Sequence, residues 1–302
     1  MDYNEETKTL TIHHSFNKKL NNIPKDTKII IFTEIKLLTY SYFNKKIENL
    51  PKNLTQLTFG YNFNQNVDKL PKNLTHLIFG FNFSQKVNNL PKNLTHLTFG
   101  NYFYQKVDNL PKKLTHLTFD YLFNHKVNNL PQNLIHLIFG YAFNQKVDNL
   151  PKNLTHLTLS HYFNQKVDNL PKNLTELTFC HYFNQKIDNL PKTITHLTLS
   201  HSFNQKVDNL PKNLTQLTLG YSFKQKADNL SKNLKELHLY SWNDIINNLP
   251  KSVEKLHIKF IPSSVQNIYN LPLTIKEVVI YHNESKKYIK LPFGTILTII
   301  KY

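Results

Sequence analysis

Residues 50–69 read Leu50-Pro-Lys-Asn-Leu54-Thr-Gln-Leu57-Thr-Phe59-Gly-Tyr-Asn-Phe63-Asn-Gln-Asn-Val67-Asp-Lys, and this pattern decides the fold. Its Leu-Pro opening recurs every 20 residues in one unbroken frame, so that residues 50–229 hold nine units. A tenth, slightly shortened unit follows, with Ser231 in the place of the proline. Self-similarity at a fixed period of roughly 20 to 50 residues is the signature of stacked repeat architectures.

Each unit is expected to contain one short strand. The alternation of Thr55-Gln-Leu-Thr-Phe59 has the two-residue period of a half-buried strand. No part of the unit has room for a three-turn helix. The proline after each opening leucine lacks an N–H donor, so it belongs to an extended return segment and not to a hydrogen-bonded strand. The unit is therefore predicted to be a coil of strand, turn and extended return.

The coils are expected to be stable only when they stack. Burying each of the six apolar side chains of a unit contributes roughly 1.5–3 kcal/mol. Ordering a unit costs about 1.5 kcal/mol per residue, or about 30 kcal/mol in all, so a lone coil cannot fold. Stacking in register would place equivalent residues in columns, among them a buried phenylalanine spine that runs from Phe43 through Phe63 to Phe223. We predict a β-rich solenoid of about nine regular 20-residue coils with one short parallel strand per coil and irregular end coils.

The period breaks at both ends, as is typical of the end coils of a solenoid. We therefore expect N-terminal irregular capping coils over residues 1–49, the repeat solenoid over 50–248, and divergent C-terminal coils with a cap over 249–302. The first part is predicted to hold strands near 28–32 and 36–40, and the last to end in an apolar strand over 295–302.

Composition restricts the compartment and the partners. The formal net charge is +17, which is typical of nucleic-acid binders, but all 37 basic residues are lysine. Arginine supplies the bidentate contacts of specific recognition, so binding of a polyanion such as nucleic acid by a lysine-rich surface is kept only as the alternative function. The single cysteine, Cys180, excludes an internal disulfide, and no apolar run is long enough to span a membrane. We expect a cytoplasmic protein without membrane contact.

The string Leu-Thr-His-Leu-Thr-Phe-Gly-x-x-Phe-Asn-Gln-Lys-Val resembles the FNIP repeat family, a relative of leucine-rich repeats known from amoebae and from large DNA viruses of amoebae. Phe143-Asn144, Phe163-Asn164, Phe183-Asn184 and Phe203-Asn204 match the signature of that family. The resemblance implies a leucine-rich-repeat-like solenoid. Because such repeats often follow an F-box, it also implies the recognition half of a ubiquitin-ligase adaptor, here without the F-box and, if the protein is viral, in the host cytoplasm.

Two columns are candidate binding residues on the expected concave face. The first column lies on the strands, at the positions equivalent to Gln56, and contains His76, His96, His116, His136, His156 and His196. The second lies just beyond the strands and contains Tyr61, Phe81, Tyr121, Tyr141, His161, His181, His201 and Tyr221. Exposed aromatic side chains are costly unless a partner covers them. The alternatives to partner binding are structural: the first column would be a solvated polar ladder, and the second would be partly buried under its neighbours.

Enzymatic activity is not expected. No triad, carboxylate pair or phosphate cradle is present, and a residue that recurs in nine coils is a poor candidate for a unique nucleophile. Histidines near Cys180 could gather in adjacent coils, but parallel ladders do not give the tetrahedral closure that zinc prefers. We predict no cofactor, no metal, and a non-enzymatic scaffold that binds a protein partner on the His/Tyr face.

Overall fold

The computed structural model describes residues 1–33, 40–241, 244–260, 271–281 and 291–300. In these ranges the regular elements are short β-strands and one 3-10 helix, η1 (Asp244–Asn248). Contacts divide the chain into two compact units, Met1–Leu154 and Thr155–Tyr302. The three-part division expected from the sequence remains a prediction. No helix in the described ranges has the length and apolar character needed to cross a bilayer.

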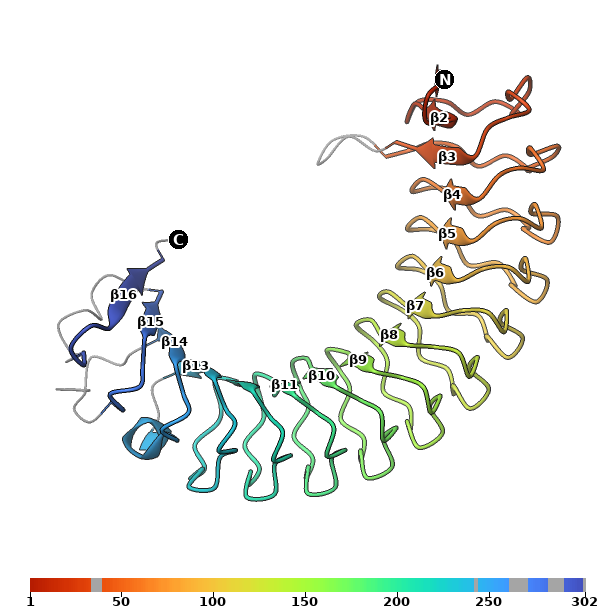
Figure 1. The fold of residues 1–302 in the computed structure, drawn as a ribbon. Coiled ribbons are helices and arrows are strands. Elements are labelled where there is room, and N and C mark those ends of the chain that lie inside the picture. Colours follow the sequence, from red (N-terminus) through yellow and green to blue (C-terminus); the bar gives the residue numbers. More distant parts are fainter. Residues whose placement is uncertain (34–39, 242–243, 261–270, 282–290, 301–302) are drawn as a thin grey trace. The chain divides into compact units, whose positions relative to one another are not determined.

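The first unit is a stack of coils, each of which contributes one strand to a single sheet (Figure 1). The antiparallel pair β1 and β2 begins the sheet, and every later strand of the unit pairs in parallel with the one before it. From β4 onward like residues pair, as Leu57 does with Leu77. The strands are β1 (Asp2–Asn4), β2 (Thr9–Ile12), β3 (Ile29–Phe32), β4 (Gln56–Thr58), β5 (His76–Ile78), β6 (His96–Thr98), β7 (His116–Thr118) and β8 (His136–Ile138).

The second unit is also a stack of coils, and its strands pair in parallel throughout. Its register is regular as far as β13, and then Glu236 pairs with Lys255 and Lys255 with Glu277, so that the 20-residue offset changes to 19 and 22. The strands are β9 (His156–Leu159), β10 (Glu176–Phe179), β11 (His196–Thr198), β12 (Gln216–Leu219), β13 (Glu236–Ser241), β14 (Lys255–Phe260), β15 (Glu277–Ile280) and β16 (Ile296–Ile299).

These strands confirm the predicted β-solenoid with one parallel strand per coil. Stacked coils extend further than the nine regular ones expected, because β2, β3 and β14 to β16 continue the sheet at both ends. The strand expected near 28–32 is present as β3, and the C-terminal one as β16. The strand expected over 36–40 falls mostly outside the described residues.

The predicted phenylalanine spine is confirmed. Phe63, Phe83, Phe103 and Phe123 are fully buried, and the rings of neighbouring coils stack with centroids 6.1–6.2 Å apart. The Phe123 and Phe143 rings stack in the same way at 6.3 Å. Each spine residue of this unit also packs on the phenylalanine that ends its own strand, as Phe63 does on Phe59 at 3.8 Å. The second unit repeats the spine from Phe183 to Phe223.

An asparagine ladder joins the coils on the side opposite the strand. Asn184 Oδ1 accepts a hydrogen bond from the backbone N–H of Asn204 at 2.9 Å and from Gln205 Nε2 at 3.1 Å. The same pair of bonds links Asn44 to the coil that follows it. The ladder therefore caps backbone N–H groups with side chains that are exposed or half-buried.

Candidate functional site

The solvent-facing side chains of the strands, with the two residues of the turn after each strand, form what we call the strand face. In β4 the alternation is as expected, because Leu57 is buried while Gln56 and Thr58 face outward. Both candidate columns therefore lie on the strand face. It is the face that the sequence predicts to be concave.

In the first unit the first column is a continuous stack of imidazole rings. The ring centroids of His76, His96, His116 and His136 are 4.2, 4.1 and 4.4 Å apart, with interplanar angles of 11–12°. In the second unit His156 Nε2 lies 3.2 Å from a carboxylate oxygen of Glu176 instead. The parallel sheet thus turns a repeated histidine into an array with one orientation.

At four histidines of the first column the preceding threonine fixes the tautomer. Thr95 Oγ1 donates its only proton to the carbonyl oxygen of Thr75, so it must accept a hydrogen bond from His96 Nδ1, which is 2.9 Å away. The neutral His96 ring therefore carries its proton on Nδ1 and has Nε2 as an acceptor. The same two contacts recur at His76, His116 and His196.

Three of the stacked histidines have a lowered pKa. Burial lowers the pKa of His96, and the neighbouring His76 and His136 lower it further. The pKa values of His161 and His201 are lowered too, first by burial and then by the charge of His181. Burial disfavours the charged form of these three rings, and a neighbouring imidazolium disfavours it further.

The second column is also stacked, and it is partly exposed. Tyr61 stacks on Phe81 at 4.5 Å and Tyr121 on Tyr141 at 4.4 Å. In the second unit His161, His181, His201 and Tyr221 follow one another at 4.5, 4.7 and 5.2 Å. Tyr121 and Tyr221 are 42% and 49% exposed, whereas the other candidate members are half-buried. Burial under neighbours and exposure to a partner therefore both occur in this column.

Among the described residues, a groove lies on the strand face of each unit, beside the second column. The groove of the first unit has a volume of about 840 Å³ and is lined by residues that include Tyr40, Tyr61, Ile78 and Phe81. The groove of the second unit has a volume of about 530 Å³ and is lined by His201, His238, Tyr240, His257 and Lys259 among others. In the second, the Lys259 ammonium lies 4.6 Å from the centre of the Tyr240 ring.

Glu236, His238 and His257 form a cluster beside this second groove. Glu236 Oε1 lies 2.7 Å from His238 Nε2 and 3.1 Å from His257 Nε2. The two imidazole rings are stacked at 3.9 Å and are nearly parallel, at 7°. In the described ranges these are the only three His, Cys, Asp or Glu residues close enough together to share a metal ion. Within the described ranges the histidines near Cys180 do not form such a group, and burial raises the pKa of the Cys180 thiol.

Sequence reasoning did not single out this cluster. Glu236 occupies the position equivalent to Gln56, and His238 occupies the position equivalent to Thr58. The available signal was the pair of strings Leu237-His-Leu and Leu256-His-Ile, which align when the coil between them is shortened by one residue.

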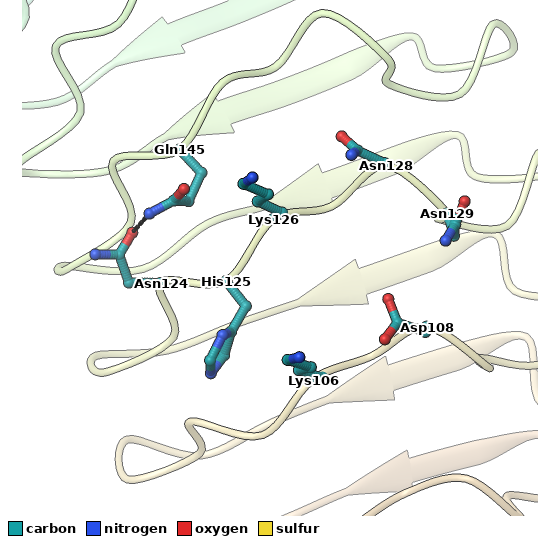
Figure 2. Close-up of a pocket in the computed structure, with 8 residues that line it drawn as sticks. All are labelled: Lys106, Asp108, Asn124, His125, Lys126, Asn128, Asn129 and Gln145. Carbon is teal, nitrogen blue, oxygen red and sulfur yellow. Dashed lines mark hydrogen bonds between the residues drawn. The ribbon is translucent and has the colours of Figure 1, made fainter.

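The opposite surface carries the lysine columns. Figure 2 shows a pocket of about 540 Å³ on the first unit, where Lys106 and Lys126 from consecutive coils lie near Asp108 and His125. Gln145 Nε2 donates to Asn124 Oδ1 at its edge, at 3.0 Å. The pocket therefore mixes both signs of charge, and a continuous cationic stripe is not formed there.

The stacked coils and their strand face define a leucine-rich-repeat-like solenoid, and the comparisons with known proteins agree. The chain belongs to the FNIP repeat family, whose model, described as FNIP Repeat, matches more than half of it. The matched residues are 43–82, 66–102, 81–122, 105–142, 123–162, 143–182, 163–202 and 183–222. No functionally curated protein matches the sequence.

Three solved structures are similar in fold. CroV588, described as a novel circular LRR protein, is 32% identical with a TM-score of 0.58 over 97% of this chain, which spans only 62% of that protein. YopM, a leucine-rich effector protein from Yersinia pestis, is 20% identical with a TM-score of 0.56, and the match covers 93% of this chain and 88% of that one. The internalin InlF from Listeria monocytogenes is 14% identical with a TM-score of 0.53, over 97% and 87%. The last two show the fold alone.

Proposed function

We propose that the protein is a non-enzymatic scaffold that binds a protein partner on its strand face. The observation that carries this proposal is the exposure of apolar side chains on strands whose inner face is already fully packed. Ile78 and Ile138 on β5 and β8 are 42% and 43% exposed, and Tyr121 on the turn after β7 is 42% exposed. Apolar side chains that gather on one face are typical of interaction surfaces, and tyrosine is enriched at binding hot spots.

The chemistry of the face also describes the partner. Neutral histidines with Nε2 as acceptor, together with tyrosine hydroxyls, suit a partner that offers hydrogen-bond donors between apolar side chains. The grooves beside the second column would receive those apolar side chains. We propose that the complex forms in the cytoplasm. Because the chain belongs to the FNIP repeat family, the proposal includes a relation to F-box adaptors.

The alternative is that the lysine columns bind a polyanion. Lysines from consecutive coils line the outer pocket, but Asp108 lines it as well. Polyanion binding would weaken steeply with salt, because lysine contacts to phosphates release counterions.

The two functions can be separated with matched variants. One carries Ile78→Ser, Tyr121→Ser and Ile138→Ser on the strand face, and the other carries Lys106→Ala, Lys126→Ala and Lys146→Ala on the outer face. Each is used as bait in the native cell with a photo-crosslinking amino acid at Gln56, on the strand face. We expect the strand-face variant to lose the crosslinked protein at unchanged melting temperature, and the lysine variant to retain it. Retention of the same protein by the strand-face variant refutes the proposal, and loss by the lysine variant alone, with salt-sensitive nucleic-acid binding, supports the alternative.

A further inference from the structure

The fold brings two histidines and one glutamate to a single point on the second unit. Glu236 and His238 are two residues apart on β13 and therefore face the same side of the sheet. His257 on β14 is the in-register partner of His238. The longer Glu236 side chain reaches from its own column to both imidazoles, at 2.7 and 3.1 Å.

One of these histidines is buried without a hydrogen bond. The His257 side chain is 12% exposed. Among the residues that the structure describes, neither of its ring nitrogens has a hydrogen-bond partner, and its 3.1 Å approach to Glu236 is only a close contact. Buried polar groups are nearly always satisfied, so an imidazole without a hydrogen bond indicates a group that the described residues do not supply. A metal cation is such a group, since a neutral imidazole is its commonest protein ligand.

We propose that Glu236, His238 and His257 bind one Zn²⁺ ion on the strand face. Zinc takes imidazole nitrogen and carboxylate oxygen at about 2.0–2.2 Å, so two ligand atoms of a tetrahedral site lie about 3.3–3.5 Å apart. All three ligand atoms here lie within 4.8 Å of one another. The imidazole rings of His238 and His257 are nearly parallel, so both must rotate before their Nε2 lone pairs can point at one ion. Magnesium and calcium are less suitable because they prefer sites made of oxygen alone.

The surroundings are compatible with a cation. The nearby ammonium of Lys255 is paired with a carboxylate oxygen of Glu277 at 3.0 Å, so its charge is offset. His238 and His257 also line the groove of the second unit, from which water can occupy the fourth coordination position.

The site would join two coils where the period changes. His238 belongs to the last coil of the regular register, and His257 lies on the next strand, after the offset has shortened to 19 residues. A bound ion would therefore tie the first irregular C-terminal coil to the regular solenoid. This role is independent of the protein partner proposed above.

The experiment is a zinc titration of the full-length protein after treatment with EDTA, by competition with a chromogenic chelator. We expect one ion per chain, a rise in melting temperature with zinc, and visible absorption typical of tetrahedral sites with Co²⁺ as the probe. Substitution of a residue that only supports a metal ligand weakens metal binding about 10- to 100-fold. Loss of a direct ligand in Glu236→Gln or His257→Phe should therefore weaken zinc binding by more than about 100-fold.

The matched control lies in the same unit. His156 and Glu176 lie on consecutive strands, with Nε2 and a carboxylate oxygen 3.2 Å apart. This pair offers two possible metal ligands, whereas the proposed site offers three. The double variant His156→Phe, Glu176→Gln should bind zinc like the wild type. Wild-type protein that binds no zinc below about 100 μM overturns the proposal. So does wild-type affinity in Glu236→Gln, which keeps the shape of the side chain, or an equal loss in the His156 control.

Discussion

The stacked core makes a quantitative prediction for Phe103→Ala. Phe103 is fully buried, with the Phe99 ring at 3.8 Å and the spine rings of Phe83 and Phe123 each at 6.2 Å. Loss of the buried ring costs about 2–3 kcal/mol in transfer free energy. A residual cavity of roughly 100 Å³ at about 24 cal/mol per Å³ adds about 2.4 kcal/mol if the neighbours do not relax. We therefore expect the free energy of unfolding to fall by about 3–5 kcal/mol.

The adjacent residue supplies the control. The Tyr104 side chain is 57% exposed, so Tyr104→Ala should change stability by no more than about 0.5 kcal/mol. Both variants are compared by urea denaturation and by hydrogen exchange, since a repeat protein can open coil by coil. Exchange should accelerate most in the coils that contain Phe83, Phe103 and Phe123. Equal losses in the free energy of unfolding for the two variants would refute the claim that the buried phenylalanine spine stabilises the core.

Two further predictions concern the ladders. Asn184→Ala should lower the free energy of unfolding by about 0.5–1.5 kcal/mol, because two hydrogen bonds at the surface are lost, whereas Asn184→Asp keeps the oxygen that accepts both; equal urea midpoints for the two variants would contradict this. Because the pKa of His96 in the folded state lies below 6.5, the unfolded chain binds the proton first, and stability present above about pH 6.5 is lost as the pH falls. His96→Gln should reduce the difference between urea midpoints measured at pH 8 and pH 5.5, and an unchanged difference would show that the stack does not carry this effect.

The regular part of the fold could be predicted because one period governs it. Once equivalent residues pair in register, the inward position of Phe63 and the outward position of Gln56 follow from strand geometry. The period does not say which columns touch within a coil. The packing of Phe59 on Phe63 at 3.8 Å depends on where the turn after the strand places the chain. The period does not specify the path of that turn.

The grooves could not be predicted for a related reason. Their shape depends on how side chains of different size fill neighbouring columns, as Ile78 and Phe81 do in the first unit. A column read from the sequence gives the identities of its members and not the space between them. The candidate columns were therefore found, while the grooves beside them were not.

The zinc cluster shows where repetition limits such reasoning. Counting 20 residues from His238 leads to Ile258, and only the shortened offset pairs His238 with His257. Within the regular coils a column presents identical side chains in parallel, so stacked histidines such as His96 and His116 point the same way and do not converge. Convergence needs a longer side chain from a second column, which Glu236 supplies. A repeat protein therefore gains a unique site where its columns stop being uniform, and the first irregular coil is the place to look for one.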